Sequence, residues 1–178
     1  AETGTRCVIR EHATVGLVVT TVGSVADLPR EAYLDAERRI IAELDGIGKP
    51  YIILLNCAEP DSDDAQRLAA ELAETYGHAV LPLNCTTMTV ETLDKLLQTL
   101  LYEFPIRENA VQMPASVTKL ESGHWLLSAV YTSMLDFAAS VHRMADLAGK
   151  RPQLGCEYIT AASLTGMDLA SGSVSITA

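Results

Sequence analysis

The chain has 178 residues, which is enough for one ordinary domain, or for one domain and part of another. Its 23 acidic and 13 basic residues give a formal net charge of −10, and no basic stripe is visible, so we expect no nucleic-acid partner. The hydrophobic content of 48% supports a packed core and excludes a disordered chain.

The cysteine and hydrophobic patterns exclude two further classes. The 4 cysteines form no CxxC pair and have no histidine at ligand spacing, a pattern typical of reduced thiols without a zinc site. The longest uncharged helical run, residues 125–135, is too short to span a bilayer, so we expect no transmembrane segment. Residues 1–6 match neither a signal peptide nor a transit peptide and lack an initiator Met, which favours a trimmed or partial chain.

The first predicted elements are a strand and a helix. Residues 14–21 are mostly β-branched and apolar, predict a buried strand, and end in the polar pair Thr20–Thr21. A turn follows at residues 22–24, and Pro29 lies in the first turn of a helix that ends at Gly48. Apolar residues at intervals of three and four indicate that helix: Tyr33, Ala36, Ile40, Leu44 and Ile47.

Residues 51–56 form the central strand of the predicted sheet. Five apolar residues run without alternation from Tyr51 to Leu55 and reach a polar corner at Asn56. An unbroken apolar run of this length, bounded by prolines, is typical of a parallel strand that helices cover on both faces.

A second helix and a third strand follow. Asp61 or Ser62 can cap the helix, and Gly77 ends it. Residues 79–83 predict the strand. Because proline lacks the backbone donor that a sheet uses, Pro82 places this strand at the sheet edge or at an unpaired position.

A third helix, capped by Thr89 and ended by Pro105, completes a strand–helix order repeated three times. This order predicts a parallel sheet with right-handed crossovers, hence an α/β domain over residues 1–105. Three strands are few for an independent domain of this kind, so we expect part of it to lie upstream.

The pattern changes after Pro105. Residues 106–121, which contain Pro114, predict a linker, and residues 122–178 predict the start of a second, α+β domain. In this domain we expect one long helix and two short strands, at residues 122–148, 156–160 and 173–177.

No complete active-site motif is present. The GxxxxGK[ST], GxGxxG, GxSxG and HExxH patterns are all absent from the sequence. We interpret the carboxylates of the predicted helices as solvated side chains: Glu31, Asp35, Glu71 and Glu74. The methionine and aromatic residues of the helix at 122–148 are interpreted as a core face.

Two predicted strands end in the same dipeptide, Asn56–Cys57 and Asn84–Cys85. Ligands of open parallel sheets bind beyond the carboxyl ends of the strands, so we expect both dipeptides at a binding edge and next to each other. In P-loop GTPases, two such corners, an NKxD motif and an SAK-type loop, recognise the base. Here the first corner keeps Asn, replaces Lys by Cys57 and lengthens Asp to Glu59. The alternative is that both Asn side chains only cap loops.

Several segments together carry a closer resemblance: residues 8–21, 28–31, 47–50, 101–105, 124–126, 157–159 and 162–167. They resemble the stage IV sporulation protein A family, the spore-coat morphogenetic ATPases of endospore-forming bacteria. The resemblance implies the rear half of a P-loop GTPase-like ATPase domain, followed by the start of the middle domain of the family.

The resemblance also implies a function. The family uses ATP, with Mg²⁺, to polymerise into the basement layer of the spore coat. It acts in the mother-cell cytoplasm at the forespore outer membrane, where a small amphipathic membrane peptide anchors it and other coat proteins bind. The nucleotide contacts that this implies are Asn56, Cys57, Glu59, Asn84 and Cys85. No catalytic or metal-binding residue is assigned, because the Walker A and Walker B segments of the family lie upstream.

One position departs from the family, and two alternatives stay open. Val22 stands where relatives commonly carry an acidic residue, so the role of that position is unassigned. Without a P-loop, this chain alone is expected not to hydrolyse ATP. The first alternative is a structural module that binds coat partners without nucleotide. The second is a Rossmann-like small-molecule enzyme, against which the missing glycine fingerprint counts.

Overall fold

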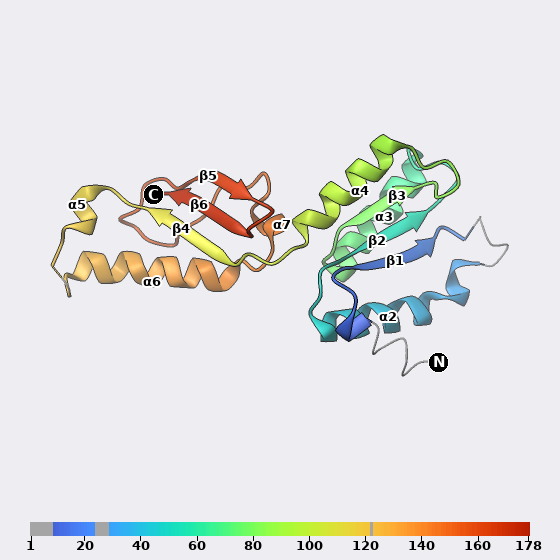
Figure 1. The fold of residues 1–178 in the computed structure, drawn as a ribbon, viewed down its shortest axis with the longest axis horizontal. Helices are drawn as coiled ribbons and strands as arrows, with labels where there is room; N and C mark the ends of the chain where they lie inside the picture. The colour runs from blue at the N-terminus through green and yellow to red at the C-terminus, as the bar shows by residue number, and fades with distance from the viewer. Residues whose placement is uncertain (1–8, 24–28, 122) are drawn as a thin grey trace. The chain divides into compact units, whose positions relative to one another are not determined.

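The computed structural model describes residues 9–23, 29–121 and 123–178. The chain forms two compact units, Ala1–Glu103 and Phe104–Ala178. The first unit is an α/β unit with a parallel three-stranded sheet, and the second contains a mixed three-stranded sheet (Figure 1).

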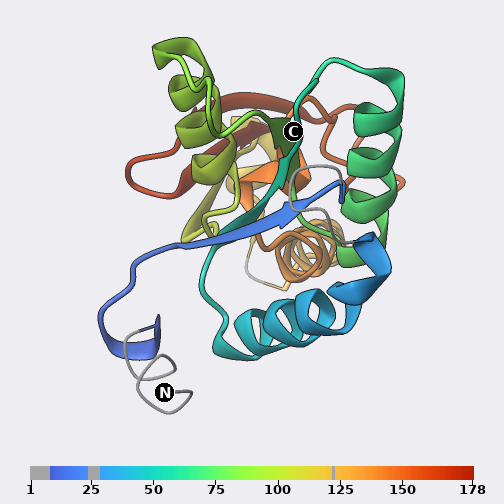
Figure 2. The same cartoon turned by 90° about the vertical axis from the view of Figure 1, so that its right-hand side faces the viewer.

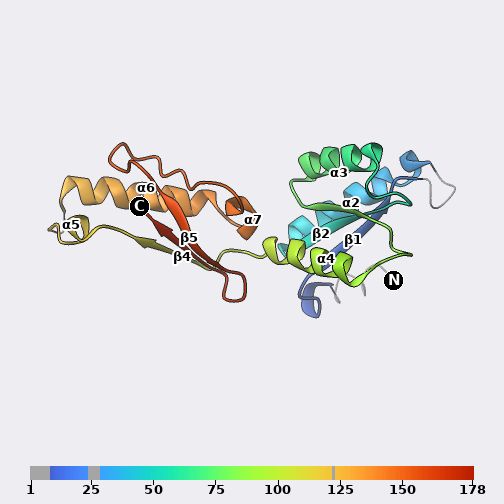
Figure 3. The same cartoon turned by 90° about the horizontal axis from the view of Figure 1, so that it is seen from above.

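In the first unit, strand order is β1-β2-β3 and both pairings are parallel. The strands are β1 (Gly16–Thr21), β2 (Tyr51–Asn56) and β3 (Val80–Leu83). The helices are η1 (Arg30–Ala32), α2 (Leu34–Ile47), α3 (Asp63–Tyr76) and α4 (Val90–Tyr102). Figure 2 and Figure 3 show α4 on the side of the sheet opposite to α2 and α3.

The central strand β2 is buried on both faces. Ile53 packs with the residues of α2, and Leu55 packs with those of α3. Ile52 and Leu54 point the other way and pack with Leu96 of α4. This confirms the buried parallel strand that the unbroken apolar run predicts, because each successive side chain needs its own apolar cover.

The helix ends and the sheet edge also follow the sequence. Ser62 and Thr89 cap α3 and α4, each accepting a hydrogen bond from the backbone N–H three residues later. Gly77 ends α3 in the left-handed conformation, with φ of 69°. β3, which contains Pro82, lies at the edge of the sheet, as predicted.

The first helix differs from the prediction in its start and in its buried face. Residues 27 and 28 of the expected start lie outside the described residues, and Pro29 precedes the short helix η1. Within α2, Ile40 is 47% exposed, although the predicted stripe includes it. The buried face instead carries Ile41, Leu44 and the carboxylate of Glu37.

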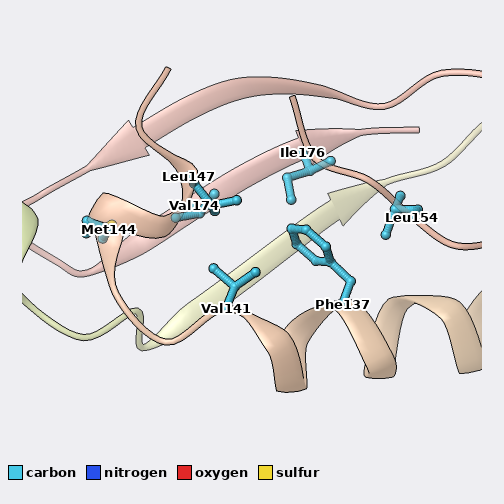
Figure 4. Packing of buried hydrophobic residues seen from close by; sticks show 7 residues of the cluster. All are labelled: Phe137, Val141, Met144, Leu147, Leu154, Val174 and Ile176. Atoms are coloured by element: carbon cyan, nitrogen blue, oxygen red, sulfur yellow. The ribbon is translucent and has the colours of Figure 1, made fainter. Parts of the chain in front are cut away.

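In the second unit, strand order is β4-β6-β5. The strands are β4 (Glu108–Gln112), β5 (Ser163–Asp168) and β6 (Ser173–Thr177), and the helices are α5 (Ala115–Thr118), α6 (Trp125–Ser140) and α7 (Met144–Leu147). β6 pairs in parallel with β4 and antiparallel with β5. In Figure 4, Phe137 and Val141 point from the α6 segment toward Val174 and Ile176 of β6.

The expected linker at residues 106–121 is not a linker in the structure, because it contains β4 and α5. The backbone N–H groups of Arg107 and Glu108 donate to the carbonyl of Gly172, at 2.8 and 3.3 Å, and this starts the pairing of β4 with β6. The prediction missed β4 because only Val111 in this short strand is a strongly apolar residue.

The expected long helix at residues 122–148 is also wrong. Ser122 lies outside the described residues, and the helix divides into α6 and α7 around Val141, whose φ of −119° and ψ of 114° are extended. The carboxylate of Asp146 accepts hydrogen bonds from the N–H groups of His142 and Arg143, at 3.0 and 2.9 Å. These bonds cap a new helix at the point where the apolar pattern alone predicts continuity.

Of the two strands expected in the second domain, the one at residues 173–177 is confirmed as β6 and the one at residues 156–160 is wrong. Turn hydrogen bonds occupy that segment, from Cys156 N–H to Leu154 O and from Ile159 N–H to Cys156 O. The strand forms later, as β5. No helix in the described part of the chain is long and apolar enough to cross a membrane.

The cap at Asp146 gives a test of the division of the expected long helix into α6 and α7. Burial raises the pKa of Asp146, but the backbone donors Arg143 and His142 outweigh it and lower the pKa below its usual value. A lowered carboxyl pKa stabilises the fold fully above the unfolded value of about 3.9, and this stabilisation is lost as the pH falls through the folded value.

We therefore expect Asp146→Ala to lower the free energy of unfolding by about 1 kcal/mol at pH 7, and by progressively less below about pH 4. Urea unfolding followed by fluorescence of Trp125, the only tryptophan, measures the second unit. Asp136→Ala, at an exposed position of α6, is the control. A loss that stayed constant down to about pH 2 would contradict the cap.

Candidate functional site

The three strands of the first unit end at one level. Thr21 lies opposite Asn56, and Asn56 lies opposite Leu83. Backbone hydrogen bonds continue past the strands, from Val22 N–H to Asn56 O at 3.3 Å and from Cys57 N–H to Leu83 O at 3.0 Å. We call the residues at this level, Thr21 to Gly23, Asn56 to Glu59 and Asn84 to Cys85, the carboxyl edge.

The two Asn–Cys corners are joined by side-chain hydrogen bonds. The Oδ1 atom of Asn56 accepts from the backbone N–H of Cys85 at 3.0 Å, and the Nδ2 atom of Asn84 donates to the carbonyl of Ala58 at 3.2 Å. The predicted neighbourhood of the two corners is therefore confirmed. Each Asn holds the loop of the other strand in addition to any local turn, and their contact with a nucleotide stays a prediction.

The two cysteines of the edge lie in different surroundings. Cys57 is 3% exposed, and its Sγ atom lies 3.9 Å from the carbonyl of Leu83, whereas Cys85 is exposed. Burial raises the pKa of the Cys57 thiol, and so does the nearby Cys85. Cys57 is therefore a neutral packing residue at physiological pH, and Cys85 is the accessible thiol of the edge.

Glu59 is exposed beside a hollow of about 510 Å³. Val22, Cys57 and Ala58 line the side toward the sheet, and the first two turns of α3 line the other. The hollow contains three carboxylates, those of Glu59, Asp64 and Glu71. Arg67, the cation that lines it, lies 2.6 Å from the Asp64 carboxylate. A surface with this charge repels a polyanion such as a triphosphate.

A buried polar network contacts the end of β1, next to the carboxyl edge. The Glu37 side chain is 3% exposed and contacts Arg30, Thr20 and Tyr76. Burial raises the pKa of Tyr76, and the hydrogen bond to Glu37 raises it further. The sequence analysis missed this network. The available signal was the spacing of Glu37, Ile41 and Leu44, which places a carboxylate on the buried face of α2.

Among the residues that the structure describes, no group of three or more His, Cys, Asp or Glu side chains could hold a metal ion. The polar groups at the carboxyl edge include the amides of Asn56 and Asn84 and the carboxylate of Glu59.

The two thiols test the geometry of the edge. We expect iodoacetamide to alkylate Cys85 at least tenfold faster than Cys57 at about pH 8, because burial both disfavours the thiolate of Cys57 and blocks access to it. Peptide mass spectrometry of partly labelled protein measures both sites, and labelling in denaturant gives the reference in which the two rates converge. Equal rates in the native protein would mean that Cys57 is not buried as described.

Comparisons with known proteins assign both parts of the chain to one family. The family model described as the ATPase domain of stage IV sporulation protein A matches residues 1–105, and the model of its middle domain matches residues 106–178. No solved structure matches the chain significantly.

Relatives from three bacteria are about one third identical to the chain over the aligned residues. Stage IV sporulation protein A of Bacillus anthracis and that of Bacillus subtilis (strain 168) are each 35% identical over 173 residues. This covers 97% of the chain and 35% of each relative. The protein of Clostridioides difficile (strain 630) is 36% identical over 149 residues, 84% of the chain and 30% of the relative. The chain thus spans about a third of these relatives, and it belongs to the stage IV sporulation protein A family.

Proposed function

We propose that the first unit forms the base-binding side of an ATPase domain with a P-loop GTPase-like architecture, whose phosphate-binding segments lie upstream of Ala1. The observation that supports this most is the pair of hydrogen bonds between the Asn56 and Asn84 corners, at the carboxyl edge of a region that matches an ATPase domain. Ligands of parallel sheets bind at this edge.

The first corner lacks the features that select guanine in this proposal. In the GTPases that it resembles, an Asp accepts two hydrogen bonds from guanine and a Lys packs over the base. Glu59 is one methylene longer, and Pro60 restricts its backbone to extended angles. Losing hydrogen bonds to a charged partner costs roughly 1.5–3 kcal/mol, or about ten- to a hundredfold in affinity, which removes the preference for guanine.

The residues of the edge fit the base of ATP and do not fit its phosphates or Mg²⁺. The hollow beside Glu59 is acidic, and its Arg67 is paired with Asp64. Phosphoryl transfer requires cationic and backbone groups that hold the phosphates and the metal. In this proposal those groups come from the upstream Walker segments. The present chain contributes base recognition through Asn56, Glu59, Asn84 and Cys85, and the buried Cys57 contributes only through its backbone and its packing.

An uncovered face of the sheet offers a place for the upstream part of the domain. Leu17 and Val19 of β1 are 48% and 59% exposed, on the face that α4 covers only over β2 and β3. The flank of α4 with Lys95 borders β3 across a hollow of about 410 Å³. By helical spacing, the exposed Leu93 and Leu97 therefore lie on the flank toward β1. These exposed apolar side chains are ones that an upstream helix would cover.

Within the whole protein, we propose that ATP hydrolysis drives self-polymerisation during assembly of the spore coat. By resemblance to the family, this takes place in the mother-cell cytoplasm at the forespore surface. The partners are further copies of the protein, a small amphipathic membrane peptide and other coat proteins. The alternative is a structural module without nucleotide, and it is supported by the 2.9 Å bond from Thr86 N–H to Asn84 Oδ1, which shows this amide closing its own turn.

Competition binding on the longer protein, with its upstream segment, tests the base site. We expect GTP to displace a labelled ATP analogue no better than ATP does, because the guanine contacts of the first corner are lost. We expect Asn56→Ala to weaken ATP binding about tenfold, because a bond that fixes both corners is lost. Gln98→Ala, at an exposed position of α4, should bind as the parent does. The present chain alone should show no ATP turnover above a buffer blank.

Two outcomes would contradict the proposal. The first is a longer protein that prefers GTP. The second is an Asn56→Ala variant with unchanged ATP affinity and an unchanged fold, which would favour the structural module.

A further inference from the structure

The Glu37 carboxylate organises the end of β1 through a closed set of hydrogen bonds. The Arg30 Nη2 atom lies 2.9 and 3.1 Å from its two oxygens, the Tyr76 hydroxyl donates to Oε1 at 2.8 Å, and the Thr20 hydroxyl donates to Oε2. On its other side, Arg30 Nη1 donates to the backbone carbonyl of Thr21 at 2.8 Å and lies 3.3 Å from the Thr20 hydroxyl. Arg30 thus connects the buried carboxylate to the last residue of β1.

A network of this kind contributes little net free energy to the stability of a helix. Glu37 and Arg30 have side-chain exposures of only 3% and 14%, and buried ion pairs repay the loss of water poorly compared with apolar residues of similar size. Glu37 lies on α2, and its side-chain partners come from three other elements, β1, α3 and the short helix η1. A role in position therefore explains the network better than a role in stability.

The positioned element is the corner that follows β1. Its Val22 N–H donates to Asn56 O at 3.3 Å, and its Gly23 N–H donates to the Thr21 hydroxyl oxygen at 3.1 Å. Val22 also lines the hollow that Cys57 and Glu59 border. A shift of Thr21 would therefore move one wall of the hollow and break the bond that joins β1 to the Asn56 corner.

We infer that Arg30 and Glu37 are positioning residues of the carboxyl edge, and that the segment Thr21–Val22–Gly23 is a third corner of the ligand site, beside the Asn56 and Asn84 corners. The identity of the ligand as ATP rests on the proposed function, whereas the position of the corner does not. In this arrangement Glu37 fixes the Arg30 guanidinium, and Arg30 fixes the Thr21 carbonyl.

Two variants separate position from stability. Arg30→Lys keeps the charge but loses the planar group that reaches Glu37 and Thr21 together. The fourfold variant Thr20→Val/Arg30→Met/Glu37→Leu/Tyr76→Phe replaces the network by apolar groups, a change that leaves stability equal or raised in other buried networks. Arg38→Lys is the matched control, because Arg38 lies on α2 next to Glu37 in sequence, 3.9 Å from Asp35, with both side chains exposed.

The first readout is amide hydrogen exchange of the present chain. We expect exchange of the Val22 and Gly23 amides to accelerate at least tenfold in both variants, while the amides of β2 and the midpoint of urea unfolding in the fourfold variant keep their parental values. The second readout is equilibrium binding of ATP to the longer protein, which should weaken about tenfold in both variants. The control should match the parent in both readouts.

The two readouts distinguish a failure of the positioning role from a failure of the assignment of the corner to the ligand site. Parental exchange at Val22 in Arg30→Lys overturns the positioning role, and it does so even if the fourfold variant fails to fold. Faster exchange with unchanged ATP affinity overturns the assignment of the corner to the ligand site. A longer protein that binds no ATP at all refutes the proposed function and the ATP arm of this inference, and the exchange result still decides whether Arg30 and Glu37 position the corner.

Discussion

The burial of β2 on both faces is the constraint from which the first unit is built. A strand with apolar side chains on both sides needs a helix layer on each side, and α2, α3 and α4 supply them. Each of these helices follows a parallel strand, so each strand ends on the same edge of the sheet. The polar residues that follow the strands therefore lie together at this edge, outside the apolar core.

The carboxyl edge is held together by groups that link one strand end to the next. Asn56 connects β2 to the loop after β3, Asn84 returns a bond to the loop after β2, and Arg30 connects the end of β1 to the buried Glu37. None of these bonds lies in a regular helix or strand ladder. This concentration of fixed polar groups on a rigid sheet is what a binding site for a small planar group requires.

Most helices and strands of the first unit could be predicted, because the sequence features that specify them are local. The apolar run before Asn56, the caps at Ser62 and Thr89 and the glycine after α3 each specify one element by itself. The neighbourhood of the Asn corners then follows from the parallel order. The Glu37 network could not be predicted with the same ease, because it joins four elements and one carboxylate among many solvated ones gives a weak signal.

The second unit was predicted less well because its elements depend on distant contacts. β4 is short and weakly apolar, and it becomes a strand only through its pairing with β6, more than sixty residues later. The break between α6 and α7 depends on a single cap at Asp146 inside a continuous apolar pattern. Pairing partners and single caps override local propensity, and this explains both errors.

The central claim is that the carboxyl edge of the first unit holds the base of ATP. Photo-cross-linking of the longer protein with 8-azido-ATP, followed by peptide mass spectrometry, tests this claim most directly, since the reactive group is on the base itself. The account predicts that excess ATP suppresses the label and that it lies within residues 21–23, 56–59 or 84–86. A suppressible label confined to the second unit, or to other parts of the first, would contradict it.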